Sequence, residues 1–287
     1  MVRLKISLAI SIEERSKTMN KILSMKKYSF IFKFEVMTAL QYIKDILLNM
    51  TGYIMHIFIF FNLWNYVYDD PSRLINGYSK SQMIWYIIVT EIIWGATGGR
   101  SLCRKICNDV KSGSITYNLN KPYSYIGYVV SSHLGQALVK IITATVFGVV
   151  LGIIFCGDFP CKSIIAVIIV LLSMFLATLI NTLFVTFIGL FSFIIEDANP
   201  FYWLYSKAIL VLGTLFPVEF FPGVLQVLIK FSPIYVTCYG PAKLFVDFSS
   251  ERALKIIVAQ LLYLVVAWLM CYMLYRKGVR RLNVNGG

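Results

Sequence analysis

The sequence lacks the motifs by which enzymes bind nucleotides or metals. It has only two histidines, His56 and His133, too far apart for a His-Glu-x-x-His site. It has no Gly-x-x-x-x-Gly-Lys-[Ser/Thr] phosphate loop, and the glycine-rich stretch 95–101 lacks the required lysine. We therefore expect no catalytic residue, no metal site and no cofactor bound by this chain.

The six cysteines also lack a metal-binding pattern. Cys103 and Cys107 lie four residues apart on one helical face, without a second Cys or His pair nearby. Cys156 and Cys161 flank a short loop and form either a disulfide or two free thiols. We favour the free thiols.

Charged residues make up only 14% of the chain, whereas 58% of the residues are hydrophobic. The run Ile46–Tyr68 is uncharged and long enough to cross a hydrocarbon core of about 30 Å as a helix. We predict an all-α integral membrane protein with six transmembrane helices, near residues 46–68, 82–99, 137–156, 164–195, 201–218 and 255–275.

The net charge of +13 is distributed unevenly between the predicted loops. Nineteen Lys and Arg residues fall on the side that holds both termini, and seven fall on the other side. Positive charge stays on the cytoplasmic side during insertion, so both termini are predicted to be cytoplasmic. The basic charge then indicates contact with anionic membrane lipids and no nucleic-acid partner.

The first 45 residues divide into two predicted segments. Residues 1–24 are expected to be a disordered N-terminal extension. In residues 25–45, Phe30, Phe34, Met37 and Leu40 recur at helical spacing between charged residues. This pattern predicts an amphipathic helix at the membrane interface, followed by a membrane domain over 46–280.

Two features inside predicted spans carry polar groups. Glu91 lies about 15 Å deep, where a carboxylate is costly unless it faces protein or water. It lines a path through the protein, contacts a partner subunit, or is protonated within the helix bundle. Thr178, Thr182 and Thr186 form a polar stripe at helical spacing, with Asn181 beside them, that serves as a path lining or as a helix–helix contact.

Two links between spans have distinctive local signals. After the second span, Asp109 and Lys111 end a short cytoplasmic helix, and Gly113 suits its left-handed cap. Before the last span, helix-breaking prolines enclose an apolar segment too short to cross the membrane. This predicts an external re-entrant helix, with a gate formed by Pro217, Glu219, Pro222 and Gly223.

These features together resemble the type-2 permeases of ATP-binding-cassette (ABC) transporters. The stretches Ile75–Tyr86, Asp109–Ile115 and Leu119–Pro122 resemble a bacterial branch whose ATPase is a separate chain. The resemblance covers about residues 25–280, and Asn120 before Lys121 departs from the usual pattern of the family.

The resemblance implies an exporter permease in the bacterial plasma membrane that pairs with a second permease subunit and with ABC ATPase subunits. ATP and magnesium would bind to the ATPase. A drug, an antimicrobial peptide or a lipid-like molecule are all open as substrates. The ATPase would contact the link after the second span, through Arg104, Lys105, Asp109, Lys111, Ser112 and Gly113. The alternative is an ion-coupled secondary transporter with Glu91 as its proton site, but we see no inverted repeats in the sequence.

Overall fold

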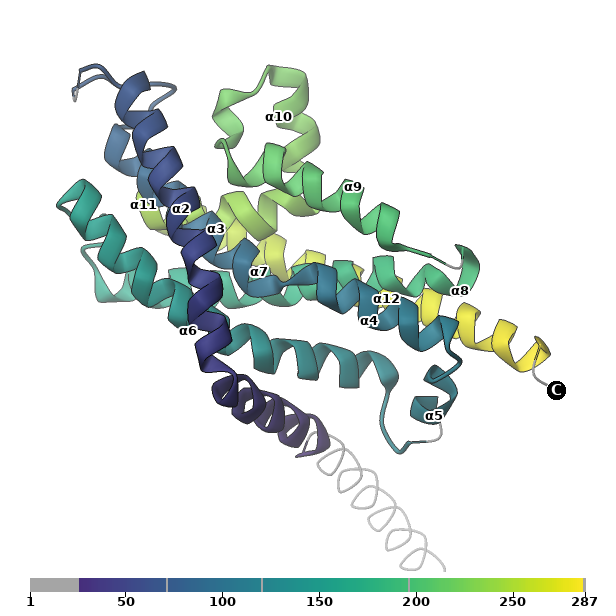
Figure 1. Ribbon diagram of the computed structural model, residues 1–287. Coiled ribbons are helices and arrows are strands. Elements are labelled where there is room, and N and C mark those ends of the chain that lie inside the picture. The colour runs from purple at the N-terminus through teal and green to yellow at the C-terminus, as the bar shows by residue number, and fades with distance from the viewer. Residues whose placement is uncertain (1–25, 71, 120, 196, 286–287) are drawn as a thin grey trace, which may run out of the picture.

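The protein, described here from a computed structural model, is an assembly of helices (Figure 1). The structure describes residues 26–285 except 71, 120 and 196, so the predicted extension over 1–24 lies outside the described residues. A helix over residues 26–41 comes first. It is followed by α2 (Ile43–Val67), α3 (Lys80–Thr97), α4 (Gly99–Lys111), α5 (Ile115–Leu119), α6 (Tyr125–Cys156), α7 (Ile164–Leu190), α8 (Ser192–Ile195), α9 (Asn199–Ile209), the π-helix η1 (Leu210–Thr214), the 3₁₀-helix η2 (Val218–Phe220), α10 (Gly223–Lys230), the π-helix η3 (Tyr235–Tyr239), α11 (Gly240–Val246) and α12 (Ser250–Asn285).

The predicted all-α class is confirmed, because the described residues contain no strand and only one isolated bridge, between Ile75 and Tyr78. Four helical segments of the described chain are long and apolar enough to cross a membrane. These are Ile43–Val67, Tyr125–Cys156, Ile164–Ile195 and Ser250–Arg280. The segments predicted as the second and fifth spans are not among them, so a count of six stays a prediction.

Helix α3, the predicted second span, lies at the centre of the bundle. Every residue from Met83 to Ile93 is buried, by packing against α2, α6, α7 and α11. Gly152 of α6 permits the closest approach, since a Cβ there would lie 2.2 Å from the indole of Trp85. Because protein surrounds α3, its sequence tolerates polar residues that a lipid-facing helix would not.

Several helix boundaries differ from the predicted spans. Helix α6 begins at Tyr125, twelve residues before the predicted start of the third span at residue 137. Its polar first turns face the helix over 26–41, where Glu35 accepts hydrogen bonds from Ser132 Oγ and Gln136 Nε2, both at 2.7 Å. The polar residues that obscured this start in the sequence are therefore paired with a carboxylate from another helix.

The helix over 26–41 has its apolar stripe on the exposed side. Phe30, Phe34, Met37 and Leu40 are all more than half exposed. The opposite side carries Glu35 and contacts α6. Val36 and Ala39 also lie on the packed side, in an apolar cluster with Val139 of α6. The distribution suits the predicted contact with a membrane interface, because the free side is apolar.

Helix α3 continues almost directly into α4, and the two follow one another in Figure 1. A capping box fixes the start of α3: Ser79 Oγ accepts from the Gln82 backbone N–H, and the Gln82 side chain accepts from the Ser79 backbone N–H. At the other end, Gly98 adopts a left-handed φ of +43°, which joins the two helices with a single residue. The connection between α3 and α4 is therefore a single residue.

All six cysteines are free thiols in the structure. Cys156 and Cys161 do not form a disulfide, so the favoured one of the two alternatives is confirmed. Cys103 and Cys107 lie on the buried face of α4.

Candidate functional site

The link between α3 and α6 is a compact helical hairpin made of α4 and α5. Helix α4 buries an apolar face that includes Leu102 and Ile106 and exposes Arg104 and Lys111. Gly113 follows its end with a left-handed φ of +71°, the conformation predicted for this position. In Figure 1, α5 lies at the end of the molecule opposite to α10.

Asp109 holds this hairpin together. Its Oδ2 accepts a hydrogen bond of 2.8 Å from the hydroxyl of Tyr125, the first residue of α6. Its Oδ1 accepts from Ser114 Oγ at 3.2 Å, just before α5 begins. One carboxylate therefore links α4, the residue before α5 and the start of α6.

Two of the predicted basic residues are also held within the chain. The ammonium group of Lys105 lies 4.9 Å from the ring centroid of Tyr128. Lys111 Nζ lies 3.3 Å from the carboxylate of Asp197, in the connection between α8 and α9. The pKa of Asp197 is lowered because the backbone N–H and the side-chain amide of Asn199 donate hydrogen bonds to it and Lys111 lies beside it.

The remaining predicted residues leave a surface that a partner can reach. Arg104 and Ser112 are exposed on α4 and its cap. On α5, the side chain of Tyr117 is 79% exposed. The sequence analysis missed Tyr117, and the only signal was an aromatic residue between the Gly113 cap and Pro122.

Glu91 lines a cavity of about 380 Å³ between α2, α3 and α6. Its side chain is nearly fully buried, and its Oε1 has no hydrogen-bond partner among the described residues. Its Oε2 lies 3.7 Å from Nδ1 of His56, beyond hydrogen-bond distance. Tyr53 and Lys140 line the same cavity, and the buried Tyr53 hydroxyl also lacks a described partner.

The polar stripe on α7 is turned into the packed interior. The hydroxyl of Thr178 donates to the Met174 carbonyl at 2.9 Å, and that of Thr182 donates to the Thr178 carbonyl at 2.8 Å. Asn181 Oδ1 accepts a hydrogen bond of 2.7 Å from Tyr205 of α9. All three predicted residues are buried, with these polar groups satisfied by their own helix or a neighbouring one.

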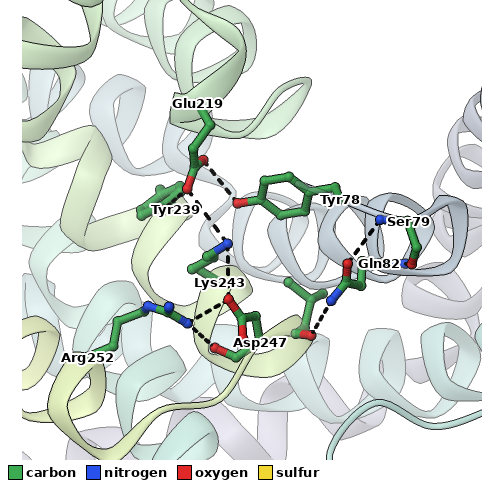
Figure 2. Close-up of polar contacts among 9 residues, drawn as sticks. Tyr78, Ser79, Gln82, Glu219, Tyr239, Lys243, Asp247 and Arg252 are labelled. Carbon is green, nitrogen blue, oxygen red and sulfur yellow. Dashed lines mark hydrogen bonds and ion pairs between the residues drawn. The ribbon is translucent and has the colours of Figure 1, made fainter. Parts of the chain in front are cut away.

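Glu219 of η2 is the acceptor of a polar cluster at the other end of the bundle (Figure 2). It accepts hydrogen bonds from the hydroxyls of Tyr78 at 3.0 Å and Tyr239 at 2.6 Å. Lys243 Nζ of α11 lies 3.7 Å from the same carboxylate and 4.1 Å from the ring centroid of Tyr78. The cluster ties the η2–α10 segment to α11 and to the loop before α3.

A second carboxylate extends this cluster toward α12 (Figure 2). Asp247 lies 3.3 Å from Lys243 Nζ and 2.8 Å from Arg252 Nη1. The sequence analysis identified only Glu219 here, because Tyr78 and Lys243 are 141 and 24 residues away from it along the chain. No local pattern joins them.

The other predicted gate residues shape the backbone of this segment. Pro217 precedes η2, and Pro222 precedes α10, whose first residue is Gly223. A short helix between Pro222 and Pro233 was predicted, and its position in a membrane stays a prediction. Its apolar side chains are largely exposed: Val224, Leu228 and Phe231 are 77%, 62% and 82% exposed.

Comparison with known protein families gives a match over most of the chain. Residues 47–286 match the family described as ABC-2 family transporter protein. The matched region contains α3, the α4–α5 hairpin, the Glu91 cavity and the Glu219 cluster. A search of curated proteins found no relative that matches the chain.

Proposed function

The chain belongs to the ABC-2 family of transporter membrane proteins, and we propose that it is the permease subunit of an ATP-driven exporter. The family is a membrane transport component, and its members work with ABC ATPase subunits. In our proposal the ATPase is a separate chain that binds ATP and magnesium, and this chain is not an enzyme. A second permease subunit completes the path for a drug, an antimicrobial peptide or a lipid-like molecule.

The proposed topology has six spans in the bacterial plasma membrane, with both termini in the cytoplasm. Helix α3 supplies the second span, and α9 with η1 supplies the fifth. Neighbouring helices cover α3, and α9 with η1 is shorter than each of the four candidate spans. Both facts are consistent with a weaker apolar signal in these two segments. The α4–α5 hairpin is then cytoplasmic, and α10 with the Glu219 cluster is external.

The observation that carries the proposal is the direct connection of an exposed hairpin to the central helix. Helix α5 presents Tyr117, Asp109 of α4 accepts a hydrogen bond from Ser114 just before α5, and α4 continues through Gly98 into α3. Closure of the ATPase against α5 would push α4, and α4 would move the helix that carries Glu91. Because α3 is packed on all sides, its movement would change the contacts between α2, α6 and α7.

A crosslinking experiment tests this proposal. Tyr117→Cys should crosslink to cysteines placed on the ATPase surface and block turnover of the assembled complex. Lys277→Cys, an exposed position on α12, is the matched control and should react with soluble reagent without crosslinking. If Tyr117→Cys stays freely reactive in the assembled, ATP-bound complex, the hairpin does not contact the ATPase.

One observation favours the alternative of an ion-coupled transporter. Glu91 is buried, and His56 Nδ1 lies 3.7 Å from its Oε2, so a small side-chain movement would bring these two titratable groups into hydrogen-bond distance. Transport by the chain in vesicles, driven by an imposed pH gradient without ATP, would support that alternative. Transport that requires the ATPase and ignores the gradient would exclude it.

A further inference from the structure

The cavity between α2, α3 and α6 contains two groups of opposite charge, Glu91 and Lys140, that do not pair with each other. Among the described residues the one ion-pair contact of Glu91 is His56 Nδ1, which lies 3.7 Å from its Oε2 and beyond hydrogen-bond distance. Glu91 is buried, and its Oε1 has no partner. Lys140 is half-buried in the same cavity and forms no ion pair with a described residue. A charge withdrawn from water is costly unless another group compensates it. Two such charges in one cavity therefore indicate a ligand that carries their complements.

The two charges lie at different heights in the cavity. Lys140 Nζ lies 3.1 Å from the point where a Cβ on Gly98 would sit. Glu91 precedes Gly98 by seven residues on the same helix, which corresponds to a rise of about 10 Å. The carboxylate and the ammonium group are therefore too far apart to form a hydrogen bond or an ion-pair contact with each other. A ligand placed between them would meet an anionic wall at one end and a cationic wall at the other.

The remaining walls suit the head group of an amphiphile. Trp94 and Tyr53 supply aromatic surface, and the buried Tyr53 hydroxyl has no partner. Gly52 and Gly95 line an exposed side of the cavity, and a Cβ at either position would meet nothing within 4 Å. An apolar tail can leave through this open side, between helices that are candidate or proposed spans.

We propose that this cavity binds an amphiphile with a zwitterionic head group. Its amine lies beside Glu91, and its phosphate or carboxylate lies beside Lys140. A simple organic cation would compensate Glu91 but meet the uncompensated Lys140, and a simple anion would do the reverse. The claim that this amphiphile is the cargo rests on the proposed function, whereas the claim that it binds does not.

Binding is tested on the purified full chain in an uncharged maltoside detergent, without ATPase. Three probes have the same brominated dodecyl tail and a phosphocholine, trimethylammonium or phosphate head group. The brominated tail quenches Trp94 fluorescence when the probe is bound. The variant Trp94→Phe measures the quenching of the other tryptophans, which is subtracted. The phosphocholine probe should bind about tenfold more tightly than either singly charged probe, because only it compensates both charges.

Charge variants should reverse this order. Lys140→Met should shift the preference to the cationic probe, and Glu91→Gln should shift it to the anionic probe. Glu91→Asp and Lys140→Arg keep the charges and should keep the order, which separates loss of charge from loss of fold. Gly95→Leu should weaken the binding of all three probes. A Cβ at this position meets nothing within 4 Å, so the fold accommodates the side chain, but the side chain occupies the cavity.

The result that overturns the inference is an unchanged order of the three probes in Lys140→Met and Glu91→Gln. Equal affinity of the wild-type chain for all three probes overturns it as well. In the complex with ATPase, stimulation of ATP hydrolysis by the phosphocholine probe identifies cargo, and binding without stimulation identifies a resident lipid head group. Both support the site, and failure of the binding test leaves the crosslinking test of the proposed function unaffected.

Discussion

Replacement of Glu219 by alanine should release the η2–α10 segment from the bundle. The change leaves two buried hydroxyls, of Tyr78 and Tyr239, without their acceptor, and it leaves Lys243 with Asp247 alone. A buried donor that loses its partner costs about 1–3 kcal/mol. Because the Glu219 side chain is 35% exposed, water replaces part of the loss. We therefore expect the free energy of local opening to fall by about 2–4 kcal/mol.

Hydrogen exchange of the α10 amides measures this opening. A loss of about 2–4 kcal/mol corresponds to exchange that is about 30- to 1,000-fold faster. Glu219→Gln keeps one acceptor but turns an amide N–H₂ toward Lys243, so an intermediate loss of about 1–2 kcal/mol is expected. The matched control is Glu251→Gln, which removes the same charge from the exposed ion pair with Lys255. That control should not alter exchange in α10, because exposed ion pairs contribute little.

Two outcomes would refute this reasoning. Exchange in α10 that is equal in Glu219→Ala and in the wild type would show that the cluster does not hold the segment. Exchange that accelerates equally throughout α7 and α12 would show global destabilisation instead of local release. Restoration of slow exchange by a further substitution that removes both hydroxyls, Tyr78→Phe with Tyr239→Phe, would support the assignment of the cost to those groups.

Three further predictions follow from the hairpin, the packing of α3 and the absence of a nucleotide motif. Asp109→Ala should lower the unfolding free energy by about 1–3 kcal/mol, because the buried Tyr125 hydroxyl loses its acceptor. Asp109→Asn should lower it by less than half of that amount, and denaturant titration in detergent compares the two variants. Gly152→Ala should destabilise the protein by about 1–3 kcal/mol in the same titration, since its Cβ would meet the Trp85 indole. Gly95→Ala is the control without that clash, because a Cβ there meets nothing within 4 Å. The purified chain alone should show no ATP hydrolysis, and specific hydrolysis by this polypeptide would contradict the assignment of the nucleotide site to a partner.

The features that the sequence predicted well depend on short-range physics. A long uncharged run predicts a membrane helix because backbone hydrogen bonds are satisfied within the segment. Gly113 predicted its own left-handed φ because few other residues adopt it without strain. The prolines at 222 and 233 limited α10 to one short helix, because proline cannot continue a helix that precedes it.

The partners and surroundings of the candidate site residues could be identified only from the tertiary structure. Glu91 was identified by its depth in a predicted span, but its missing partner and the shared cavity with Lys140 depend on how α2, α3 and α6 pack. Glu219 was singled out between two prolines, and its tyrosine and lysine partners come from distant segments.

The same helix positions can also carry different roles, and only packing decides between them. Thr178 and Thr182 fitted both a path lining and a helix contact from their spacing, and the structure turns them into the interior with their hydroxyls bonded to their own helix. Helix α3 has a weak apolar signal because protein, not lipid, covers it. Periodicity determines which residues share a face, but the surroundings of that face are set by segments far away in the chain.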